Sequence, residues 1–228
     1  MPDTPVIDRP RTALLCVCLI AAPLAETIEQ VLSPLTGGTT ADDLAAIAAA
    51  PGRFMASVLI GLLGTALLLP ALLGLARRGS DRSPVLALLA AIAIGASSLG
   101  FAGVRMAQGF EYALARSGMP RADAAALFDA GTGTVVALAL TVAFLGGTVV
   151  GTVLLAIALW RSHRVPIGAL VLLLLFPLVD LALPARPGPV ISHLVLLASF
   201  IWIAIALLRA APARRVRSGS RRSVTTGA

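Results

Sequence analysis

Apolar residues fall in six long runs along the chain, and shorter stretches with charged residues, Gly or Pro separate them. A run of about 20 apolar residues crosses the hydrocarbon of a bilayer as a helix. The pattern therefore predicts an all-α fold, a polytopic membrane bundle with six transmembrane helices. The expected spans are Thr12–Leu32, Phe54–Ala76, Pro84–Val104, Val135–Trp160, Val165–Leu183 and Val190–Leu208.

The runs divide the chain into three parts: a short N-terminus at 1–11, a transmembrane domain at 12–208 and a basic tail at 209–228. Arg9 and Arg11 precede the first run, as they would in a signal peptide. Five further runs follow it, so we expect a retained helix instead. The tail mixes arginine with Ser, Gly and Thr, which predicts a disordered segment.

Two of the connections between spans are long enough to hold helices of their own. Thr40, Ala41, Asp42 and Asp43 have the order of a capping box, which predicts a short helix through Ala50. Pro120 is typical of a helix start, so 120–130 is predicted to form a second short helix. Both connections lie on the same side of the predicted bundle, and we expect both helices on its outer surface.

The composition agrees with a membrane protein, since 58% of the residues are hydrophobic and 13% are charged. Soluble domains have about 45–50% apolar and about 25% charged residues. The chain has no lysine, which excludes a Schiff base to a lysine and a Walker A phosphate loop. The formal charge of +7 follows the loops, so it indicates membrane topology and not nucleic-acid binding.

The arginines set the predicted orientation, because cytoplasmic loops carry an excess of basic residues. With the N-terminus inside, the inner segments hold Arg9, Arg11, Arg77, Arg78, Arg82, Arg161, Arg164, Arg209, Arg214, Arg215, Arg217, Arg221 and Arg222. The outer segments hold Arg53, Arg105, Arg116, Arg121 and Arg186. We therefore expect a multi-pass protein of a bacterial cytoplasmic membrane, with both termini in the cytoplasm.

Five arginines of the tail are candidates for binding anionic lipid: Arg214, Arg215, Arg217, Arg221 and Arg222. A solvated tail that only stops translocation explains them equally well. Membrane lipids are thus the first expected partner.

A proline followed by a carboxylate three residues later occurs in the first and the fifth span, as Pro23–Glu26 and Pro177–Asp180. Each proline predicts a kink, because it removes a backbone donor. Both helices run outwards, and both carboxylates lie roughly 22–24 Å from the inner face at 1.5 Å per residue. Charges at such depth are costly and mark a function or a pair, so both side chains are expected to face one interior site.

Glu29, Arg105 and His193 lie in the same outer half as these carboxylates, and Arg105 is the expected bridge between Glu26 and Asp180. One interpretation is an outward-facing acidic site for a small solute, a proton or a cation. The other is structural: the carboxylates pair with Arg53, Arg105 and Arg186 and hold helix ends together. Carboxylates at close range cannot both ionise cheaply, which favours proton or cation binding.

Small residues predict close helix packing in the fourth span, where Gly147 and Gly151 form a Gly-xxx-Gly pair. Gly64-Thr65 in the second span has a counterpart in Gly151-Thr152 in the fourth, which suggests an internal repeat. His163 and His193 fall on opposite sides of the membrane, which argues against a shared haem. Cys16 and Cys18 point to different sides of one helix, so no metal site and no cofactor are expected.

Three short segments are similar to a family of uncharacterised bacterial six-helix membrane proteins. They are Arg11-Thr12-Ala13, the stretch from Ala41-Asp42-Asp43 to Arg53-Phe54, and the basic pair Arg77-Arg78. The resemblance covers about residues 11–208. It implies a six-helix membrane fold and carries over no activity and no functional residue.

The function these observations favour is transport or binding of a small solute at an outward-facing acidic site, linked to a proton or another cation. The alternative is a structural or accessory subunit that binds another membrane protein. A third reading, an intramembrane enzyme acting on lipid, would use Glu26, Asp180 and His193 as acid–base groups.

The predicted topology can be tested with single cysteines and an impermeant thiol reagent added from outside. Reaction is expected at cysteines replacing Gly38 and Gly118, and none at cysteines replacing Gly79 and Gly219, because only the first pair lies outside. Outside labelling at position 219 would overturn the predicted orientation.

Overall fold

The computed structural model describes residues 9–183 and 187–210, and 87% of these described residues are helical. Within these residues there are eight helices and no strand. They are α1 (Arg9–Leu32), α2 (Thr40–Ala49), α3 (Pro51–Gly79), α4 (Pro84–Ala115), α5 (Arg121–Thr132), α6 (Val135–Ser162), α7 (Ile167–Ala182) and α8 (Gly188–Ala210). The predicted all-α class is confirmed, and the basic tail at 209–228 lies almost wholly outside the described residues.

Five helices are long and apolar enough to cross a membrane: α1, α3, α4, α6 and α8. These five give the protein the dimensions of an integral membrane protein. The sixth expected span is shorter, since α7 has 16 residues, or about 24 Å at 1.5 Å per residue. The hydrocarbon core is roughly 30 Å thick, so the expected sixth span is not established by length.

Local sequence signals explain where α2 and α5 begin. The capping box of α2 starts one residue earlier than predicted, because Thr39 accepts from the backbone N–H of Asp42 while Asp42 accepts from that of Thr39. The Thr39 hydroxyl and N–H hold the pKa of the Asp42 carboxyl below its usual range. Pro120 is the residue before α5 and leads the chain into it.

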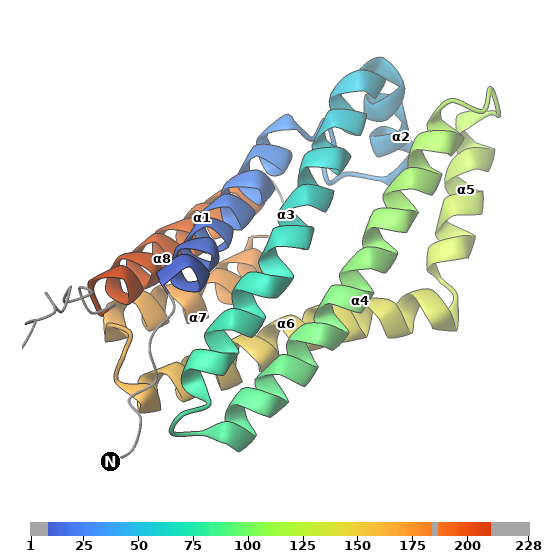
Figure 1. Cartoon of the computed structure of the whole chain (residues 1–228). Helices are drawn as coiled ribbons and strands as arrows, with labels where there is room; N and C mark the ends of the chain where they lie inside the picture. Colours follow the sequence, from blue (N-terminus) through green and yellow to red (C-terminus); the bar gives the residue numbers. More distant parts are fainter. Residues whose placement is uncertain (1–8, 184–186, 211–228) are drawn as a thin grey trace, which may run out of the picture.

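The six longer helices run up and down in chain order and form a closed ring, in which each contacts the next and α8 returns to α1. The short helices α2 and α5 contact each other and lie at one end of this ring (Figure 1). Thr40 of α2 donates a hydrogen bond of 2.7 Å to Asp129 of α5. The described ends of α1 and α8 lie together at the opposite end (Figure 1).

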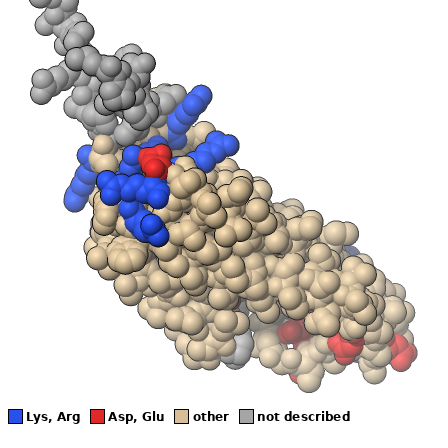
Figure 2. Space-filling model, turned by 90° about the horizontal axis from the view of Figure 1, so that it is seen from below, with Lys and Arg blue, Asp and Glu red and all other residues tan. Residues whose placement is uncertain are grey.

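Charge is divided between the two ends of the molecule (Figure 2). The end with the α3–α4 and α6–α7 turns carries exposed arginines, and Arg164 there pairs with Asp81 at 2.6 Å. The other end carries the aspartates of α2 and α5. We call these the basic end and the acidic end.

The half of the ring nearest the basic end is filled by apolar side chains. Leu75, Leu155, Leu159, Phe200 and Ile203 are fully buried there and belong to one cluster that draws on all six helices. Cys16 and Cys18 also belong to it as small buried residues. Burying this surface in close contact supplies the packing that holds the helices together.

Helices α4 and α6 contact each other closely through glycines. A Cβ atom on Gly147 would lie 2.6 Å from the carbonyl oxygen of Ala93, and one on Gly151 would lie 3.0 Å from Ile94 Cγ1. Ser97 and Thr148 share a hydrogen bond of 2.7 Å across the same contact. Gly147 and Gly151 thus lie where a side chain would push α6 away from α4.

Replacing Gly147 with alanine is therefore expected to destabilise the protein by about 1–3 kcal/mol, because backbone atoms of α4 must move. Gly146→Ala is the matched control, since a Cβ there meets nothing within 4 Å. Thermal unfolding in detergent measures both variants. Equal midpoints for the two variants would show that α4 and α6 are not in close contact at Gly147.

Candidate functional site

A cavity of about 310 Å³ occupies the half of the ring nearest the acidic end. All six longer helices contribute to its wall. Its polar lining residues are Glu26, Glu29, Gln30, Thr65, Ser97, Ser98, Arg105, Gln108, Thr148, Thr152, Asp180 and His193. Leu173 and Phe200 belong both to the cavity wall and to the apolar cluster, so that cluster forms the floor of the cavity.

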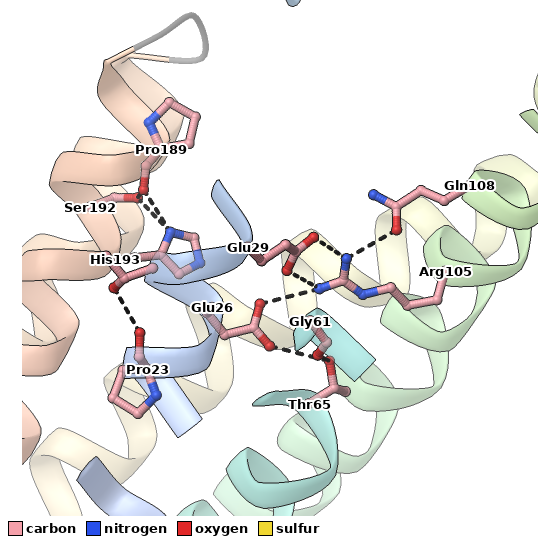
Figure 3. A network of polar contacts seen from close by, with 11 residues as sticks. Pro23, Glu26, Glu29, Gly61, Thr65, Arg105, Gln108, Pro189, Ser192 and His193 are labelled. Carbon is pink, nitrogen blue, oxygen red and sulfur yellow. Dashed lines mark hydrogen bonds and ion pairs between the residues drawn. The ribbon is translucent and has the colours of Figure 1, made fainter. Parts of the chain in front are cut away.

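Arg105 of α4 binds two carboxylates of α1 at the cavity wall (Figure 3). Its Nη2 donates to Glu26 Oε2 at 3.2 Å and to Glu29 Oε2 at 2.5 Å, and its Nη1 donates to Glu29 Oε1. Nη1 also donates to Gln108 at 3.0 Å. Residues 26, 29 and 105 are only 3%, 3% and 6% exposed, so these charged groups pair with each other away from water. We call Glu26, Glu29 and Arg105 the ion triad.

Helix α3 makes room for the ion triad with two glycines. A Cβ on Gly61 would overlap the Glu29 carboxylate and the Arg105 guanidinium, and one on Gly64 would lie 2.6 Å from Glu26 Oε1. Thr65 of the same helix donates to Glu26 Oε1 at 3.3 Å (Figure 3). The absence of side chains at these two positions lets the carboxylates reach between α3 and α4.

The ring of Phe101 lies against the guanidinium of Arg105, with 4.4 Å between Cζ and the ring centroid. A guanidinium over an aromatic face is stabilised by the ring quadrupole. Phe144 of α6 stacks on Phe101 at 4.9 Å between centroids. The aromatic pair therefore extends the cavity wall from the ion triad to α6.

The two prolines at which the sequence predicts kinks lie inside helices, Pro23 in α1 and Pro177 in α7. Thr27, one turn after Pro23, donates to the Pro23 carbonyl at 2.7 Å. Pro177 is buried and lines the cavity one turn before Asp180. Each proline thus lies about one helical turn before a carboxylate, Glu26 in α1 and Asp180 in α7.

Asp180 lines the same cavity as Glu26 but has different partners. Ser192 of α8 donates to Asp180 Oδ1 at 2.7 Å. His193 Nδ1 donates to the Pro189 carbonyl at 2.7 Å, and its ring meets Phe176 edge-on at 5.6 Å between centroids. The hydroxyl of Ser192 thereby anchors the second carboxylate between α7 and α8.

The arginines differ in part from the sequence-based expectation. Arg105 was expected to bridge Glu26 and Asp180, whereas it binds Glu26 and Glu29, because the two glutamates share one face of α1. The structural interpretation pairs Arg53 with a carboxylate, but Arg53 donates to the carbonyl oxygens of Val31 and Leu32 at 3.0 and 2.6 Å. It therefore caps the unpaired carbonyls at the end of α1. Arg186 lies outside the described residues, as do the five tail arginines.

Sequence reasoning missed the contribution of α3 and of the aromatic wall. The repeated Gly-Thr pair was the available signal, since Gly64-Thr65 contacts Glu26 and Thr152 lines the cavity. In the sequence alone, the repeated pair indicates a duplication and does not mark a site. Phe101 had no signal of its own, because an aromatic residue in an apolar run is common.

Comparison with models of known families, with curated proteins and with solved structures finds no match. The resemblance to a six-helix family therefore gains no support and stays a prediction. Among the described residues, no group of three His, Cys, Asp or Glu side chains is arranged to hold a metal ion.

Removing the guanidinium with Arg105→Met should cost about 3–5 kcal/mol of stability, because two buried carboxylates lose their partner. Adding Glu26→Gln and Glu29→Gln should recover part of this loss, because these two positions then carry no charge without a partner. Arg116→Met is the control: Arg116 is exposed at the end of the same helix and donates to Tyr112 at 2.8 Å. Unfolding in detergent measures the series, and a triple variant no more stable than Arg105→Met would refute the charge argument.

Proposed function

We propose that this chain is a six-span membrane protein that binds a small solute in the cavity and carries it across the membrane. The cavity is the observation that carries the proposal, because all six longer helices wall it and its polar groups cluster at one level. A ligand site of about 300–1,000 Å³ with mostly apolar walls and a few polar groups is typical of small-molecule binding.

The sixth span of the proposal is α7 together with the apolar residues Val165 and Leu183 that flank it. This segment lies between α6 and α8 in the ring and contributes Phe176, Pro177 and Asp180 to the cavity. A short span is accommodated by local thinning of the bilayer at modest cost. Without α7 the cavity would have one side open to lipid.

The division of charge supports an orientation with the basic end in the cytoplasm. The exposed arginines Arg77, Arg82, Arg161, Arg164 and Arg209 gather there, as the positive-inside rule expects. The cavity then lies in the outer half of the membrane, beneath the level of α2 and α5. Its floor, the apolar cluster, separates it from the cytoplasm.

The ion triad supports a link to a proton or another cation. Two carboxylates share one guanidinium, so the ion triad has a formal charge of −1 when both glutamates are ionised. An uncompensated charge of this kind is costly inside a membrane. A proton on one glutamate, or a cation in the cavity, would remove the cost.

The two other readings from the sequence receive less support. Glu26 accepts from Arg105 and Thr65, so it is not a free acid–base group for an enzyme. Exposed apolar side chains such as Leu14, Leu88, Val142 and Leu178 occur on several helices, which is what lipid contact requires. They do not single out one face for a protein partner.

The proposal is tested with Thr148→Cys in a chain whose Cys16 and Cys18 are replaced by alanine. Charged, impermeant methanethiosulfonate reagents of either sign are applied separately to intact cells and to inverted membrane vesicles. If the cavity binds and translocates a solute, the cysteine is expected to react from both sides, because the site must open to each in turn.

Val153→Cys is the matched control, since Val153 lies on the same helix but is 40% exposed on its outer surface. It should react from neither side, because lipid covers it. Failure of position 148 to react from either side would contradict the proposed function, and reaction from one side alone would contradict translocation.

A further inference from the structure

We infer that the solute is a small organic cation with an apolar body, and this inference rests on the proposed function. Its cationic group would lie at Asp180, and its apolar part would lie against the phenylalanine side chains that line the cavity. The cavity's charge, a carboxylate that no described arginine pairs with, and the aromatic lining each point to this class.

The cavity is negatively charged. Its charged lining residues are three carboxylates, Glu26, Glu29 and Asp180, and one guanidinium, Arg105, with His193 as a further titratable group. With all three carboxylates ionised and a neutral imidazole, the formal charge is −2, and a proton on one glutamate still leaves −1. A cavity that has a low dielectric constant and a net charge attracts ligands of opposite charge and repels ligands of the same charge. An anionic solute is therefore disfavoured.

Among the charged groups of the cavity, Asp180 is the one that a ligand can contact. The four carboxylate oxygens of Glu26 and Glu29 already accept hydrogen bonds from Arg105 or Thr65. Within the described part of the chain, Asp180 accepts only the Ser192 hydroxyl, on Oδ1, and no arginine pairs with it. A cation at Asp180 would gain a charge-assisted contact without breaking the ion triad.

The remaining wall suits an organic body better than a hydrated ion. Phe101, Phe144, Phe176 and Phe200 line the cavity together with leucine and valine side chains. Aromatic faces bind quaternary and alkylated ammonium groups. A metal ion requires several oxygen ligands around it, whereas all four carboxylate oxygens of Glu26 and Glu29 already accept hydrogen bonds from Arg105 or Thr65. The cavity of about 310 Å³ limits the solute to a small molecule.

The test is equilibrium binding to the full chain in nanodiscs, with three probes of similar size. They are benzyltrimethylammonium as the cation, benzyl alcohol as the neutral probe and benzenesulfonate as the anion. Benzyltrimethylammonium is expected to bind at least about tenfold more tightly than the other two, because only the cation offsets the negative charge of the cavity. This comparison needs no variant and does not depend on mutant folding.

Two variants locate the binding. Asp180→Asn should weaken benzyltrimethylammonium by about tenfold or more, while Asp123→Asn, an exposed aspartate on α5, should leave it unchanged. Thr148→Trp, which fills the cavity, should abolish binding of every probe.

The outcomes separate this inference from the proposed function. If benzyl alcohol or benzenesulfonate binds more tightly than the cation and Thr148→Trp abolishes that binding, the cavity binds solutes but the inference is wrong. If cation binding survives Thr148→Trp, the probe binds elsewhere and the inference is again overturned. If position 148 reacts with thiol reagents from neither side and no probe binds, both proposals fall.

Discussion

The buried contact of Arg105 with Glu26 and Glu29 is the interaction on which the outer half of this bundle depends. It joins α1 to α4 across the surface of α3, and it requires a suitable residue at each contact position of the three helices. Two glutamates three residues apart present their carboxylates on one face of α1. Gly61 and Gly64 remove the side chains that would otherwise occupy that space on α3. A charged cluster of this kind is costly to bury and costly to break, so the three helices are held in one register.

This constraint also explains why half of the ring is packed and half is hollow. Near the basic end, leucine, phenylalanine and alanine side chains fill the interior, and no ion pair is needed there. Near the acidic end, the ion triad lies at the wall and does not fill the centre, while Ser97 and Thr148 face each other across α4 and α6. Because the Ser97 and Thr148 hydroxyls bond to each other within the wall, neither needs a partner in the interior. The cavity therefore follows from polar pairing around its circumference.

The sequence could predict the helices more completely than the site. Hydropathy located the helices, and α2 was recognised from the order of Thr and Asp residues, because these signals are local. The depth of Glu26 and Asp180 could be counted along their helices, and both line one cavity. Of the two predicted partners of Arg105, Glu26 is confirmed and Asp180 is wrong, because the rotation of each helix about its own axis depends on packing with its neighbours. The contribution of Gly61 to the ion triad could not be predicted for the same reason: a glycine in an apolar run does not by itself show whether a helix approaches it, or which one.

The ion triad agrees with the structural interpretation of the charged residues, yet it does not exclude a binding role for the cavity beside it. A single guanidinium that serves two carboxylates holds the helices together and leaves an excess of negative charge at the wall. Asp180 adds to this excess from the opposite side of the ring, where Ser192 donates to it and none of the described arginines pairs with it. If stapling of helix ends were the whole purpose of these charges, pairing each carboxylate with its own arginine would be less costly. Arg53 lies near the end of α1, but its guanidinium is bound to backbone carbonyls. The imbalance between carboxylates and arginines at the cavity is thus the feature that structural pairing leaves unexplained and that a cationic solute or a proton would account for.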